Sequence, residues 1–137
     1  MTHLLDTHAW IQRALGEPLP PLVDQTLTQH ADTLALADIS LWEAAKLVEL
    51  GRLQLSVPLS EFFRLAITQE LTVLPVTPAI AERVTALEAS GFHKDPADQL
   101  IVATAIVHVL RFVSYETRIL PWGGSPMIWK TARPGEH

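Results

Sequence analysis

Four acidic residues lie close to the places where predicted strands and helices meet. Asp6 directly follows an apolar strand, Glu43 lies just inside the helix after the second strand, and Glu116 follows a later strand. Asp98 is in the first turn of a further helix. Carboxylates gathered at one edge repel each other unless cations offset their charge. Hard divalent ions prefer such oxygen ligands, so the acids form a candidate metal site that would meet phosphates.

The stretch that begins at Asp95 combines a helix start with two acids. Asp95 suits the N-cap position, and Pro96 suits the first helical position, where a missing N–H is no loss. The helix that follows is apolar on nearly every side, with Thr104 and His108 as a polar stripe, which is typical of an interior helix. Asp98 is therefore expected where a solvated surface meets a dry core, and Asp98, alone or with Asp95, is a candidate metal ligand.

Each of these acids also has an ordinary structural explanation. Asp6 can cap the helix that follows it, and Ser40 with Glu43 satisfies the Ser-x-x-Glu capping-box pattern. Glu116 can be a solvated turn residue. An acid in a first helical turn gains roughly 0.3–1 kcal/mol from the helix dipole, which accounts for Asp98 as well. Only the joint pattern of the acids favours a site.

Predicted strands and helices alternate along the chain. Strands are expected at 2–5, 33–37, 72–76 and 111–114, with an edge strand at 127–129, and helices at 7–15, 22–30, 40–50, 79–89, near 59–67 and from residue 96. This order indicates an α/β fold with a mostly parallel sheet, in which ligands bind beyond the C-terminal ends of the strands. That edge is shared by Asp6, Glu43 and Glu116, whereas topology alone does not place Asp98 on it.

Composition limits the class of protein. The 137 residues suffice for one domain, expected at 1–130, with a flexible tail at 131–137. There is no cysteine, which excludes thiolate metal sites and is compatible with a reducing cytoplasm. No apolar run is long enough for a membrane span, and no secretory signal is visible. A net charge of −5 argues against wide, purely electrostatic binding to nucleic acid.

Three segments resemble the motifs of PIN-domain proteins, most closely the VapC-type toxins of bacterial toxin–antitoxin pairs. They occur in the family's order over about residues 3 to 120, and together they are specific. The segments are Leu4-Leu5-Asp6-Thr7-His8-Ala9-Trp10; then 39–46 with Gly51-Arg52-Leu53; and 93–105, which contains Asp95-Pro96-Ala97-Asp98.

The resemblance implies a three-layer α/β/α sandwich with a roughly five-stranded sheet, and a Mg²⁺- or Mn²⁺-dependent endoribonuclease. By position, the family's catalytic and metal-binding acids fall on Asp6, Glu43 and Asp98, and a fourth, usually Asp, falls on Glu116. Asp95 then acts as the N-cap that aims Asp98. The expected partners are an RNA substrate, a cognate antitoxin and a second copy of the chain in a homodimer.

Two other functions are weighed. Phosphoryl hydrolysis through an aspartyl nucleophile at Asp6 is disfavoured because His8 stands where a second Asp is usual. A silent PIN-fold interaction module bound to its antitoxin is favoured only by Glu116, which replaces the usual Asp. Trp10 and Trp42 are assigned to core or dimer packing ahead of base stacking, and Thr7 and Ser114 are weaker candidates for orienting water.

Overall fold

The sheet has four parallel strands in the part of the chain that the computed structural model describes, residues 1–89, 91 and 95–114. They are β1 (His3–Leu5), β2 (Leu34–Ala37), β3 (Thr72–Leu74) and β4 (Arg111–Val113), in the order β3-β2-β1-β4. Leu4 is level with Ala35 on one side and with Phe112 on the other. The predicted strand at 127–129, the predicted tail and Glu116 lie outside the described residues, and the domain limit at 130 stays a prediction.

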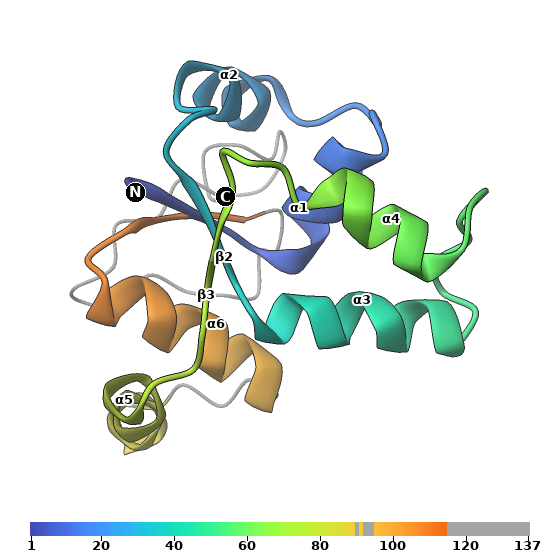
Figure 1. The fold of residues 1–137 in the computed structure, drawn as a ribbon. Coiled ribbons are helices and arrows are strands. Elements are labelled where there is room, and N and C mark those ends of the chain that lie inside the picture. The colour runs from blue at the N-terminus through green and yellow to red at the C-terminus, as the bar shows by residue number, and fades with distance from the viewer. Residues whose placement is uncertain (90, 92–94, 115–137) are drawn as a thin grey trace.

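Helices connect the strands, and their bounds lie close to those expected (Figure 1). They are α1 (Thr7–Ala14), α2 (Pro21–Gln29), α3 (Ile39–Glu49), α4 (Leu59–Ala66), α5 (Pro78–Ala89) and α6 (Pro96–Val107). Among the described residues, no helix combines the length and the apolar character that crossing a bilayer requires.

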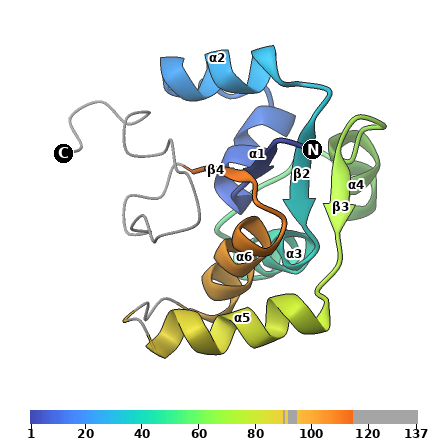
Figure 2. The ribbon, with the colours of Figure 1, turned by 90° about the vertical axis from the view of Figure 1, so that its left-hand side faces the viewer.

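Helices cover both faces of the sheet and enclose two apolar cores, so the predicted three-layer α/β/α sandwich is confirmed (Figure 2). Alternate strand residues point to opposite faces, so Leu4 and Phe112 pack against α5 and α6 while Leu5 packs on the other side with α1, α2 and α4. In α6, buried residues run without a break from Ile101 to Ala105, as expected of an interior helix. The predicted polar stripe does not face solvent throughout, because Thr104 is buried and donates to the Leu100 carbonyl.

The sheet has its topological switch point between β1 and β4. The strands β2 and β3 follow β1 in sequence and lie on one side of it. The last strand, β4, pairs with the other edge of β1. Connections therefore diverge at the C-terminal ends of β1 and β4, and such a crevice is where parallel α/β sheets bind ligands. The Asp6 N–H donates to the Val113 carbonyl at 2.9 Å, which ties the two strand ends together at this point.

The start of α3 contradicts the capping-box explanation of Glu43. The helix begins at Ile39 after Asp38, so Ser40 lies inside the helix and is not its N-cap. Ser40 is fully buried, and its hydroxyl contacts the Thr7 hydroxyl of α1 at 2.8 Å. The pattern misled because the same Ser-x-x-Glu spacing also occurs within a helix when tertiary contacts satisfy the serine.

Candidate metal centre

A small acidic pocket opens at the switch point. Its volume is about 70 Å³, room for an ion with a few waters, and its lining comes from the starts of three helices: Asp6, Thr7, His8, Glu43, Asp95, Asp98 and Ile101. Three of the four predicted site residues thus meet in one place although more than 90 positions separate the first from the last. The fourth, Glu116, lies outside the described residues.

Hydrogen bonds hold the Asp6 carboxylate in place in the lining of the pocket. It is only 4% exposed, and one carboxylate oxygen caps α1 by accepting the Ala9 N–H at 2.7 Å. The other oxygen accepts the Ser114 hydroxyl at 2.6 Å, just beyond β4. The helix-cap explanation of Asp6 is therefore correct, and it coexists with a place in the pocket, because each carboxylate oxygen has a second lone pair.

Glu43 reaches into the pocket from α3 and is positioned by a hydroxyl relay. Thr7 donates its hydroxyl to a Glu43 carboxylate oxygen. Because Thr7 has only one hydroxyl proton, the buried Ser40 must donate to Thr7 in turn. The relay fixes the rotamer of a long side chain, and it explains why a serine is buried in the first turn of α3.

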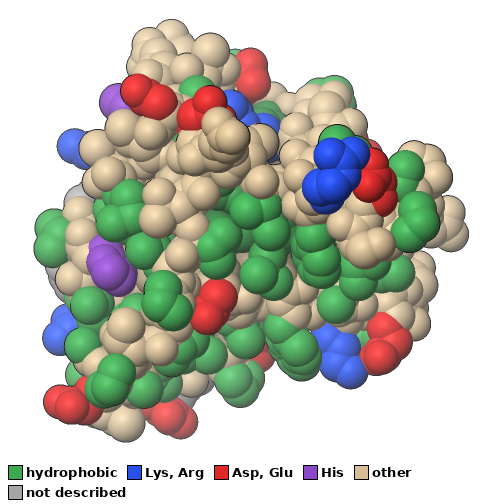
Figure 3. Space-filling view, in the orientation of Figure 1, with side chains coloured by type: hydrophobic (Ala, Val, Ile, Leu, Met, Phe, Trp, Pro, Cys, Tyr) green, Lys and Arg blue, Asp and Glu red, His purple; other side chains and the backbone are tan. Residues whose placement is uncertain are grey.

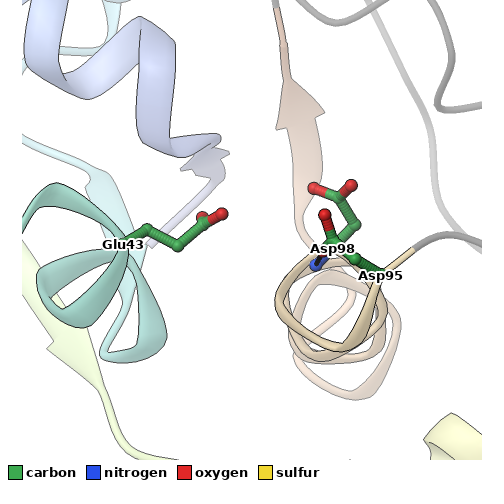
Figure 4. Close-up of side chains that lie close together, drawn as sticks. All are labelled: Glu43, Asp95 and Asp98. Atoms are coloured by element: carbon green, nitrogen blue, oxygen red, sulfur yellow. Dashed lines mark hydrogen bonds between the residues drawn. The ribbon is translucent and has the colours of Figure 1, made fainter. Parts of the chain in front are cut away.

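Asp95 and Asp98 approach Glu43 from the start of α6 (Figure 4). Asp95 is the N-cap, as predicted: its carboxylate accepts the Asp98 N–H at 2.9 Å. Glu43, Asp95 and Asp98 each present an oxygen atom within 4.8 Å of the others. Asp95 therefore belongs to the acidic cluster in addition to capping the helix. The packing of α6 against α3 creates this proximity.

The electrostatics of the pocket fit a cation. Burial raises the pKa of Glu43, and the negative charges of Asp95 and Asp6 raise it further, while the Thr7 hydrogen bond and the nearby His8 lower it. Carboxylates that resist ionisation because of burial and like charges are stabilised when a cation joins them. Their oxygens form a hard ligand set of the kind Mg²⁺ and Mn²⁺ use.

Ser40 was not predicted as a member of the site, and Asp95, first considered beside Asp98 as a metal ligand, was then assigned to capping. The predicted core or dimer packing of the tryptophans is correct for Trp10. This residue is in the core, where its indole N–H donates to the Ala66 carbonyl at 3.1 Å. Trp42 is 54% exposed, which excludes the core alternative for this residue.

The sequence is similar to a known protein family and to a known ribonuclease. The PIN domain, as a sequence family, matches residues 3–120, which is most of the chain. Ribonuclease VapC22 of Mycobacterium tuberculosis is 39% identical over 119 residues, covering 86% of this chain and 89% of that protein.

Solved structures share the fold at lower identity. VapBC2 from Rickettsia felis, bound to a DNA fragment from their promoter, matches with a TM-score of 0.70 and 16% identity, covering 93% of this chain and 98% of that chain. A toxin–antitoxin complex from Klebsiella pneumoniae matches with a TM-score of 0.68 and 20% identity, covering 93% and 96%.

Proposed function

The chain belongs to the PIN-domain family, and on that premise we propose that it is a divalent-metal-dependent endoribonuclease whose ion binds in the acidic pocket. One observation carries the proposal: Glu43, Asp95 and Asp98 bring carboxylate oxygens within 4.8 Å of one another, in a pocket that Asp6 also lines. The name of the ribonuclease from M. tuberculosis supports RNA as the substrate class.

The ligands that we assign are Asp6, Glu43 and Asp98, directly or through water, with Mg²⁺ or Mn²⁺ as the ion. When bound, a divalent ion polarises a phosphodiester oxygen and lowers the pKa of a bound water, which makes an attacking hydroxide available near neutral pH. Glu116 as a further ligand stays a prediction, since it lies outside the described residues.

The chain's own side chains supply orientation. Ser114 and the Ala9 N–H donate hydrogen bonds to the two oxygens of Asp6, which fixes the direction of its carboxylate. The relay from Ser40 through Thr7 favours the ionised form of Glu43, because a hydrogen bond donated to a carboxylate lowers its pKa. Pre-organised carboxylates bind an ion without the entropic cost of first ordering them.

We propose further that the protein acts as a toxin that a cognate antitoxin neutralises, in the cytoplasm. The fold likeness to toxin–antitoxin complexes supports this assignment. The silent interaction module is the second candidate, and growth arrest separates the two. Expression without a partner should arrest growth, and Asp6→Ala should abolish the arrest; growth that continues with wild-type protein at full expression would favour the module.

A homodimer is also proposed. Hydrophobic side chains run across the face on which β3, α3 and α4 lie (Figure 3), and Trp42, Leu50, Leu65 and Val76 are among the exposed large apolar residues. Large exposed apolar side chains are typical of surfaces that pair. Light scattering on purified protein should give twice the chain mass, and Trp42→Lys should lower that value; a monomer at micromolar concentration contradicts the proposal.

Cleavage of a fluorescent single-stranded RNA tests the enzyme itself. Activity should require Mg²⁺ or Mn²⁺, stop with chelator, and fall at least a hundredfold in Asp98→Asn, because the ion loses a charged ligand. Asp24→Asn is the matched control, since Asp24 is also an acid in a first helical turn but lies on α2. Equal rates in wild type and Asp98→Asn, with no effect of chelator, would refute the metal-nuclease assignment.

A further inference from the structure

A second hollow adjoins the acidic pocket and shares a residue with it. It is a groove of about 530 Å³ between α1 and the end of α3, and His8 lines both the groove and the acidic pocket. Leu47 lies one helical turn beyond Glu43 on α3, so the groove continues along the same helix from the acids. Anything that extends from a phosphate at the acids in this direction must enter the groove.

One face of α1 forms a wall of the groove. His8, Ile11, Gln12 and Leu15 line the groove from α1, and their spacing of three, four and seven positions puts them on one face. Ile11 is buried, and together with Leu15, Leu47 and Leu53 it makes the apolar part of the lining.

Two lining residues of the groove, Glu17 and Arg52, follow helix terminations of the same type. After α1, Gly16 at a φ of +72° lets the Glu17 N–H return to the Gln12 carbonyl at 2.9 Å. After α3, Gly51 at a φ of +73° lets the Arg52 N–H return to the Leu47 carbonyl at 2.8 Å. Both are Schellman motifs, which hold the backbone of the next residue in one place. Glu17 and Arg52 therefore start from fixed positions.

The polar lining carries hydrogen-bonding groups of several kinds. Gln12 and Gln54 supply amides that both donate and accept, Arg52 supplies a planar cation, and Glu17 supplies a carboxylate. Within the described part of the chain these four side chains have no hydrogen bond or ion pair with protein groups. An apolar floor with a rim of amide and charged groups suits a flat ring with polar edges, such as a nucleobase.

We propose that this groove is a nucleotide subsite that binds the base next to the scissile phosphodiester. The inference rests on the proposed ribonuclease function and adds where the substrate lies and what is read. The base lies against Ile11, Leu47 and Leu53, the amides of Gln12 and Gln54 meet its edge, and Arg52 contacts a flanking phosphate. Glu17 accepts a hydrogen bond from an exocyclic amino group, so adenine, cytosine or guanine is favoured over uracil.

A set of short RNAs with one varied nucleotide on either side of the cleaved bond tests the subsite. Wild type should cleave amino-bearing bases at one of these positions about tenfold better than uracil, and Glu17→Gln should reduce this preference, because a Gln amide also donates to the uracil carbonyl groups. Gln12→Ala and Arg52→Gln should raise KM about tenfold and leave kcat within about twofold, since they touch substrate away from the reacting bond. The matched controls are Gln25→Ala and Arg83→Gln on α2 and α5.

The outcomes separate this inference from the proposed function. Metal-dependent cleavage with an unchanged base profile and unchanged KM in all three groove variants overturns the subsite and leaves the nuclease intact. If wild type cleaves no RNA, fluorescence anisotropy with the same oligonucleotides on Asp98→Asn protein in Mg²⁺ still decides the subsite: equal affinity with and without Gln12→Ala and Arg52→Gln overturns it. Variants that weaken binding of the antitoxin but not of RNA would show a protein-docking groove instead, which also overturns it.

Discussion

Replacing Asp98 with Asn should raise stability in the absence of divalent ions and lower the stability that such ions add. Among the described residues of the metal-free protein, two acids, Glu43 and Asp95, have carboxylate oxygens within 4.8 Å of the Asp98 carboxylate. The substitution removes both repulsions and keeps the size of the side chain. We therefore expect Asp98→Asn to be more stable than wild type in the presence of chelator.

The magnitude follows from the separation. Two unit charges near 5 Å apart repel by about 3 kcal/mol at an effective dielectric constant of about 20, and by about 1 kcal/mol in water. Asp95 is exposed, so its repulsion is close to the lower value. Against this gain, Asn loses roughly 0.3–1 kcal/mol of interaction with the helix dipole of α6. The net gain of Asp98→Asn without metal should be about 1–3 kcal/mol at low salt.

Binding of the ion favours wild type over Asp98→Asn. An ion at a hundred times its dissociation constant stabilises the folded wild type by about 2.7 kcal/mol. For a chain of this length that raises Tm by roughly 10 °C. Asp98→Asn lacks a charged ligand, so its Tm should rise by less than half as much, and the ion should reduce its advantage over wild type by more than about 1.3 kcal/mol.

Thermal and urea unfolding measures the metal-free and metal-bound states, at about pH 8 because the pKa of Glu43 is raised. Each protein is unfolded in EDTA and again across a titration of Mg²⁺ or Mn²⁺. Asp24→Asn serves as control, because it loses only the dipole interaction of α2 and should respond to metal as wild type does. An Asp98→Asn protein that is less stable than wild type in EDTA, or that gains as much from metal, would refute the reasoning.

Three more predictions concern other parts of the chain. Burial, with the charges of His30 and Arg111, lowers the pKa of His3 from 6.5 to about 4. Between these two pH values, His3 therefore binds a proton in the unfolded chain but not in the folded one. The free energy of unfolding should fall by up to about 3 kcal/mol between pH 6.5 and 4 and then level, and urea titrations of His3→Gln should lack this component. Val109, 77% exposed with a φ of +55°, occupies the Schellman position that glycine holds after α1 and α3. Val109→Gly should therefore raise the free energy of unfolding in urea by about 0.5–1 kcal/mol. A lower free energy of unfolding would contradict backbone strain at this position. Thr7→Val removes the hydrogen bond that lowers the pKa of Glu43, so the acid limb of the kcat/KM profile should move to higher pH; an unmoved limb would show that Glu43 need not ionise.

The predicted secondary structure was largely correct because its signals are local. Asp95 caps α6 through the backbone two residues beyond Pro96, and Gly51 ends α3 through a backbone conformation that L side chains rarely adopt. The alternation of strands and helices along the chain predicted a mostly parallel sheet. None of these features needs a contact with a distant part of the chain.

The interpretation of the acids was less certain because a cap and a ligand have the same local pattern. Asp6 proved to be a cap that also lines the pocket, whereas the capping box at Ser40 was wrong because Ser40 bonds to Thr7, 33 positions away. A hydroxyl inside a helix can turn to a distant partner, and the spacing of residues in sequence does not record that choice.

The sequence by itself determined the elements, their order and the edge of the sheet at which Asp6 and Glu43 stand, because hydrophobic periodicity and turn chemistry act over a few residues. Tertiary structure alone decided that the start of α6 packs beside α3, which brings Asp95 and Asp98 to Glu43 and places the groove of Gln12 and Arg52 next to them. Such proximity depends on how whole helices pack on the two faces of the sheet. The raised pKa of Glu43 has the same origin, since burial and like charges exist only after the chain has folded.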